Sequence, residues 1–217
     1  MEYTLIKSNR KTIAIIIRDG AVIVRAPLLA DSQSIKAFVA EKEAWINERL
    51  QEYRPVGIQS DLNYAYVFGE YKEIIYINNP KWSLVIDEKI VVYSPETSSM
   101  KAKVSYIENQ LKIKLIKIID EAIDSYSQAL GLERPPYKVR KYKRIHGRCS
   151  SNDELAFNTY LYEHTIDFIH YVVLHECAHL IEFNHSKSFY ALIEASMSNY
   201  KDVIAQDKKQ LKTHLDQ

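Results

Sequence analysis

The chain has 217 residues, of which 47% are hydrophobic and 26% are charged, which is the composition of a globular protein of one domain or two small ones. Its formal net charge of +1 gives no overall attraction to nucleic acid or to an acidic membrane surface, and its 2 Cys are too few for a disulfide framework. The 5 Gly form no Gly-rich phosphate loop, and the chain shows no signal segment and no apolar run that could span a membrane, so we expect a cytoplasmic protein.

Residues 1–95 have the pattern of a β-rich N-terminal domain. Apolar runs predict strands over 2–7, 11–18, 21–27, 63–68, 71–77 and 82–93. Asp19-Gly20 supplies a two-residue hairpin turn between the second and third strands. Apolar residues at helical spacing predict a single helix over 33–51, with Asp31 or Ser32 as its cap. We therefore expect a mostly antiparallel sheet with one helix laid on it.

The period of the apolar residues changes near Ser94-Pro95, and residues 96–217 are predicted to form a second domain. A long helix is predicted over 99–130, and Gly131 is its stop signal. Strands are predicted over 137–145 and 155–158, with a loop between them. Thr165 and Ser186 can each cap a further helix. The fold class is therefore α+β.

The stretch 172–192 carries the motif H-E-x-x-H in His175, Glu176 and His179. On a helix, residues four apart lie on one face at about 6 Å, so both imidazoles can reach one metal ion. Glu176 can then act as general base for a water bound to that ion. The flanking residues are apolar nearly all round the helix, which indicates burial, and buried His and Glu side chains need partners such as a metal.

A third ligand is predicted at His185, six residues after His179. One continuous helix would carry it about 9 Å further along the axis, so the helix must break, and Phe183-Asn184 is a plausible break. Glu182 and Glu194 are the rivals: Glu182 lies about 10.5 Å from His175 along a continuous helix, and Glu194 would come from the next helix. Three His and one open position are typical of catalytic zinc.

The segment 138–148 is rich in basic residues and contains no acid. It is interpreted either as a charged edge strand that resists pairing with other chains or as a groove for a nucleotide or nucleic acid, with Tyr137 and Tyr142 available to stack on bases. An edge strand beside the metal helix could also hold a peptide substrate as an added strand.

The run from Lys138 to Glu194 resembles the YgjP-like metallopeptidase family, which is related to the SprT-like proteins. The resemblance rests on three features: the turn from His146 to Ser151, the helix motif at 172–179, and the sequence Asn184-His185-Ser186 followed by two aromatic residues. Matches at 24–27, 35–45 and 68–71 extend it over nearly the whole chain.

The resemblance implies that His175, His179 and His185 bind zinc, that Glu176 is the catalytic base, and that the C-terminal domain is a small zincin-like core. The chain departs from the family pattern at His146 and Tyr190, where Trp is usual, and at Arg148, where Ser is usual. These three residues, together with Arg144 on the basic strand, are the candidate substrate contacts.

The sequence is compatible with three functions, of which we predict the first. The first is a zinc-dependent metallopeptidase acting on a peptide or protein, in which Glu176 takes a proton from a zinc-bound water. The second is a metal-dependent nucleoside triphosphate pyrophosphohydrolase, in which the basic strand holds the triphosphate. The third is a nucleic-acid-associated binding module whose metal is structural.

Overall fold

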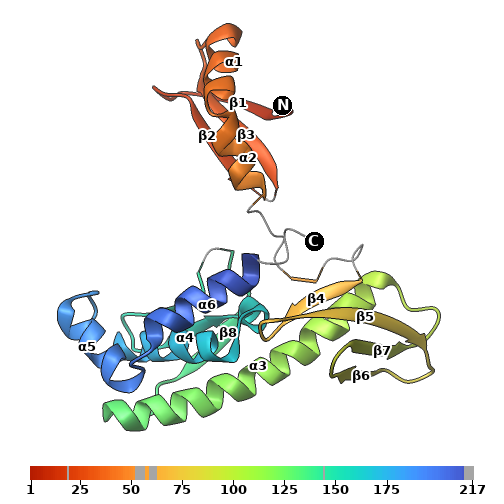
Figure 1. Ribbon diagram of the computed structural model, residues 1–217, viewed down its shortest axis with the longest axis vertical. Coiled ribbons are helices and arrows are strands. Elements are labelled where there is room, and N and C mark those ends of the chain that lie inside the picture. Colours follow the sequence, from red (N-terminus) through yellow and green to blue (C-terminus); the bar gives the residue numbers. More distant parts are fainter. Residues whose placement is uncertain (19, 52–56, 59–62, 144, 213–217) are drawn as a thin grey trace. The chain divides into compact units, whose positions relative to one another are not determined.

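The computed structural model describes residues 1–18, 20–51, 57–58, 63–143 and 145–212 (Figure 1). These residues form helices and three small sheets, which confirms the predicted α+β class. The chain divides into two compact units, one built within Met1–Val56 and the other Gly57–Leu211. Each unit is described separately.

The first unit is a three-stranded sheet covered on one face by two helices. Its strands are β1 (Thr4–Ser8), β2 (Ala14–Arg18) and β3 (Ala21–Pro27), in the order β1-β3-β2. Of the predicted hairpin turn, Gly20 has a positive φ of 73°, whereas Asp19 lies outside the described residues. The single helix predicted over 33–51 is wrong, because the structure forms α1 (Ser32–Glu41) and α2 (Glu43–Gln51) with a break at Lys42. Alternate β3 residues Val22, Val24 and Ala26 pack with Ile35, Val39 and Ile46 of the helices.

The second unit begins with a four-stranded sheet. Its strands are β4 (Tyr64–Val67), β5 (Glu70–Asn78), β6 (Ser83–Ile86) and β7 (Ile90–Ser94), in the order β4-β5-β7-β6. The strand predicted over 82–93 is two strands, because the chain turns at 87–89, where the Asp87 N–H donates to the Lys89 carbonyl. The β5–β7 pair is parallel, as is β1–β3, so the sheets are more mixed than the predicted antiparallel arrangement.

The long helix α3 (Met100–Leu130) runs through the second unit (Figure 1). The Ser99 side chain caps its first turn, and Gly131 ends it in the left-handed conformation with φ 67°, as predicted. Its buried stripe, which includes Ile107, Leu111 and Leu115, shares one apolar core with Ile74 and Ile90 of the preceding sheet. The sheet of β4 to β7 therefore shares its core with α3, and the second compact unit begins at Gly57, not near residue 95.

The elements that surround the candidate site follow α3. A second three-stranded sheet has the order β8-β10-β9, from β8 (Tyr137–Arg140), β9 (Gly147–Cys149) and β10 (Leu155–Asn158). The predicted strand over 137–145 ends at Arg140, and β9 lies where a loop was expected. The 3-10 helix η1 (Thr159–Glu163) leads into α4 (Ile166–Ala178), which is followed by α5 (Lys187–Ser196) and α6 (Tyr200–Lys212). Across the described part of the chain, no helix is long and apolar enough to cross a membrane.

Candidate metal centre

Helix α4 presents the first two histidines. It begins where the Thr165 hydroxyl accepts the Phe168 N–H at 3.1 Å, as predicted, and it packs against α3 through Ile169, Val172 and Val173. Its last helical residue is Ala178, and His179 is the C-terminal cap. His175 and His179 therefore lie on successive turns at the end of a helix whose other faces are fixed in the core.

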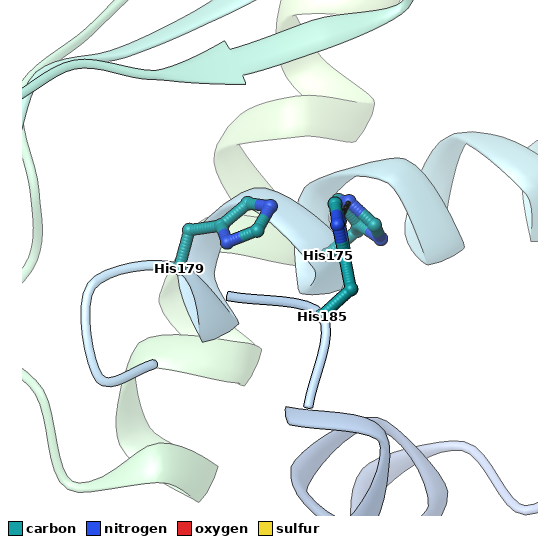
Figure 2. A group of neighbouring side chains, drawn as sticks. All are labelled: His175, His179 and His185. Atoms are coloured by element: carbon teal, nitrogen blue, oxygen red, sulfur yellow. Dashed lines mark hydrogen bonds between the residues drawn. The ribbon is translucent and has the colours of Figure 1, made fainter. Parts of the chain in front are cut away.

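The chain reverses directly after His179, earlier than the break predicted at Phe183-Asn184. The N–H groups of Leu180 and Ile181 donate to the carbonyls of Cys177 and Ala178, which closes tight turns. The Ser186 hydroxyl then caps α5 by accepting the Phe189 N–H at 3.2 Å. This reversal brings His185 back over α4, and Figure 2 shows the three rings turned toward a common space.

The ligand atoms of His175, His179 and His185 all lie within 4.8 Å of one another. Nε2 of His185 is 3.1 Å from Nε2 of His175. Nδ1 of His179 is 3.2 Å from the Glu182 carbonyl oxygen, and an N–H at Nδ1 that donates there leaves Nε2 with a free lone pair. The Tyr171 hydroxyl lies 3.5 Å from Nδ1 of His175.

The buried ring of Phe189 contacts all three histidine rings. Its centroid is 4.9 Å from the ring of His175, 4.6 Å from that of His179 and 4.9 Å from that of His185. Phe189 is fully buried, together with Leu174, Ala178 and Ile193. All three imidazoles therefore contact one apolar ring, which is buried where α4 packs against α5.

The donor set fits a transition-metal ion. Burial lowers the pKa of His175 to about 4, with the neighbouring His179 and His185 as smaller causes, and burial also lowers the pKa of His179. These two imidazoles are therefore neutral at pH 7, with lone pairs available for an ion. Three imidazole nitrogens suit zinc, copper, iron or nickel, and do not suit magnesium or calcium, which prefer oxygen ligands.

Glu176 directly follows His175 in α4 and is almost inaccessible to water, with 6% of its surface exposed. Burial raises its pKa to about 7, and the Cys149 N–H, which donates to the carboxylate, partly opposes this rise. Gly147 of β9 approaches the same side chain: a Cβ atom there would lie 2.8 Å from both Cγ and Oε1 of Glu176. Strand β9 is thus an edge strand that lies directly against the carboxyl group.

The other candidate ligands, Glu182 and Glu194, and the predicted substrate contacts do not belong to the cluster of three histidines. Among the described residues, neither Glu182 nor Glu194 belongs to a cluster of three or more possible ligands. His146 immediately precedes β9, with its ring packed edge-on against His164 and Phe168, and Arg148 is exposed on β9. Tyr190 is 40% exposed, and its ring centroid is 6.3 Å from that of His185. Arg144 lies outside the described residues.

The basic segment is partly neutralised by acids from other elements. Lys138 forms an ion pair with Glu154, and Lys141 Nζ lies 2.6 Å from a carboxylate oxygen of Glu108 on α3. These contacts agree with a charged edge strand more closely than with a phosphate groove, and the structure gives no support to a nucleotide or nucleic-acid partner.

Three residues near the site were not predicted from the sequence. Gly147 carried no signal, because its close approach to Glu176 depends on the pairing of β9 with β10. Tyr171 lies four residues before His175, a spacing that places it on the ligand face of the helix. Phe189 was expected on the inner face of its helix, but nothing in the sequence indicated that it would contact all three histidines.

Comparisons with known proteins agree with this geometry. No curated protein matches the chain. A solved structure, the metallopeptidase zymogen of Methanocaldococcus jannaschii jannalysin, is similar at 20% identity over 43% of this chain and 89% of that chain, with a TM-score of 0.38, and this likeness carries no argument by itself. The sequence model of the YgjP-like metallopeptidase domain matches residues 11–214. The chain therefore belongs to the YgjP-like metallopeptidase family, whose members are peptidase-like hydrolases that use a metal ion.

Proposed function

We propose that the chain is a zinc-dependent metallopeptidase in which His175, His179 and His185 hold the ion and Glu176 is the general base. The observation that carries this proposal is the convergence of three imidazole nitrogens within 4.8 Å, with a buried carboxyl group on the residue that follows His175. When bound, the metal supplies a Lewis acid that polarises the carbonyl of the scissile peptide bond.

The carboxyl group of Glu176 is suited to moving a proton in both directions. A carboxylate oxygen accepts a proton from the attacking water, and the same group returns it to the nitrogen of the leaving amine. Burial raises the pKa of Glu176 in the metal-free chain to about 7, and a carboxyl group with a pKa near the working pH can both accept and return a proton. Its burial excludes bulk water, which would otherwise compete for these protons.

The peptide substrate is proposed to lie along β9, whose outer edge is not paired in the three-stranded sheet β8-β10-β9. A substrate strand on this edge would hydrogen-bond to the backbone of residues 147–149 and pass next to Glu176. Arg148 and His146 would then contact side chains of the substrate, and Tyr190, beside His185, is a further proposed contact. Arg144 remains a substrate contact predicted from the sequence.

The test combines metal content with hydrolysis of a mixed peptide pool, for the wild type, Glu176→Gln and His185→Ala. We expect about one zinc per chain in the wild type, because three protein ligands are characteristic of a catalytic zinc site. Glu176→Gln should retain the metal and lose hydrolysis by roughly 10²–10⁴-fold. His185→Ala should lose most of the metal. Glu133→Gln, which removes an exposed carboxylate that is not a candidate ligand, is the matched control.

Two results would contradict the proposal. Zinc held equally by the wild type and by His185→Ala would move the third ligand to Glu182 or Glu194. Full hydrolysis by Glu176→Gln, with the Glu133→Gln control also active, would remove Glu176 from the reaction.

A further inference from the structure

The first unit has a hollow on the sheet face opposite its helices. Because alternate residues of a strand point to opposite faces, Val22, Val24 and Ala26 of β3 are buried, whereas Arg25 between them is exposed. In the parallel pairing of β1 with β3, Ile6 lies directly opposite Arg25. A hollow of about 440 Å³ forms on this face, and its walls are Ile6, Ser8, Arg10, Thr12 and Arg25.

The two arginines of this hollow have no counter-charge from the residues that the structure describes. Within the described part of the chain, neither Arg10 nor Arg25 forms an ion pair, whereas other cations such as Lys72, Lys89 and Arg134 do. The Nε atom of Arg10 is buried and has no hydrogen-bond partner among the described residues. A buried guanidinium N–H without an acceptor costs free energy unless a bound group supplies one.

We propose that this hollow binds a phosphate dianion, either the free ion or a phosphate monoester group. Two guanidinium groups match a charge of −2, and their forked donors fit pairs of phosphate oxygens. The hydroxyls of Ser8 and Thr12 line the same hollow and can donate to the remaining oxygens. A carboxylate has one charge and two oxygens and would leave half of these donors unused. The site lies in the first unit and does not depend on the proposed peptidase function.

The proposal is tested by isothermal titration calorimetry of the full chain with inorganic phosphate, with methyl phosphate and with acetate, at pH 8. The variants are Arg10→Gln, Arg25→Gln and Thr12→Ala, and Lys11→Gln is the matched control, since it removes one exposed positive charge next to the site. Phosphate that binds at a metal held by the histidines would bind Arg10→Gln as well as it binds the wild type. A loss of binding in Arg10→Gln therefore reports on the hollow alone.

We expect one saturable phosphate site in the wild type, weakened about tenfold or more in each arginine variant and by less than about twofold in Lys11→Gln, because each charge-assisted hydrogen bond contributes more than a general surface charge. Thr12→Ala keeps both charges and should bind several-fold more weakly, so the test does not depend on the folding of the arginine variants. Binding of inorganic phosphate alone assigns the site to the free ion, and binding of methyl phosphate as well assigns it to a monoester.

Three results would overturn the proposal. The first is the absence of saturable phosphate binding by the wild type, and the second is acetate binding as tight as that of phosphate. The third is an equal loss of affinity in Lys11→Gln and Arg10→Gln, which would show a general charge effect.

Discussion

The burial of Glu176 has a cost for the stability of the metal-free protein. An ionised carboxylate that is 6% exposed loses most of its hydration, and this is why its pKa rises from 4.5 to about 7. Folding therefore favours the protonated form. Above pH 4.5 the unfolded chain releases this proton readily, whereas the folded chain holds it until about pH 7. The free energy of unfolding thus falls as the pH rises from 4.5 to 7, so far as this group contributes.

Glu176→Gln is accordingly expected to stabilise the chain while it abolishes hydrolysis. With metal removed by a chelator, the free energy of unfolding at pH 7 should rise by about 1–2 kcal/mol, which is less than the full pKa shift implies because the buried amide is also desolvated. The gain should vanish near pH 4.5. Urea unfolding at pH 7 and pH 4.5 measures both values, and Glu194→Gln is the exposed control. A loss of stability at pH 7 in Glu176→Gln would contradict this account.

At the scale of elements, the segment between β8 and β9 is tied to β10 by one side chain. Asn158 is 7% exposed, and its amide nitrogen donates to the carbonyls of Tyr142 at 2.9 Å and Ile145 at 2.8 Å. Its amide oxygen accepts the N–H groups of Tyr142 at 3.1 Å and Tyr160 at 3.2 Å. Three of these bonds hold the segment that leads into β9, and the pairing of β9 with β10 places Gly147 against Glu176.

Asn158→Ala is expected to lower the free energy of unfolding by about 2–4 kcal/mol, because it leaves several partly buried backbone groups without these partners. It should also reduce hydrolysis, since β9 would no longer be held against Glu176. Denaturant unfolding and peptide hydrolysis measure these effects, and metal content should stay at the wild-type level because the histidines lie on other elements. Asn152→Ala, an exposed change in the same region, is the control. A stability equal to that of the wild type would contradict the role assigned to Asn158.

The elements that the sequence predicted well are those that depend on local signals. The caps at Thr165 and Ser186 and the stop at Gly131 lie where they were expected, because each uses hydrogen bonds within one turn of its helix. The breaks at Lys42 and after His179 were missed or misplaced, since tertiary packing determines where an apolar stripe must turn. The parallel pairings and the approach of β9 to Glu176 bring together distant segments, and no local pattern predicts them.

At the scale of the whole molecule, the two compact units have separate apolar cores. One core contains Val24 and Ile35, and the other contains Leu111 and Val173. The histidine cluster belongs to the second unit, and the arginine hollow belongs to the first. The units are therefore expected to respond to different ligands.

Differential scanning calorimetry of the full chain is expected to show two unfolding transitions. Zinc should raise the midpoint of one transition, and a chelator should lower it, because a ligand stabilises only the unit that binds it. At 100 times its dissociation constant, a ligand adds about 2.7 kcal/mol to the stability of its unit. The second transition should not respond to zinc. A single transition that shifts as a whole would show that the two units unfold together.

The ring of Phe189 has a consequence for the entropy of metal capture. A flexible trio of histidines would lose rotameric freedom at the moment an ion arrives, and the affinity would be reduced by that loss. The contacts with Phe189 restrict the three histidine rings before any ion binds. Part of the loss of rotameric freedom therefore occurs when the chain folds. The binding step is left with little reorganisation, and selection among ions then depends on whether an ion accepts the shape that the rings already have.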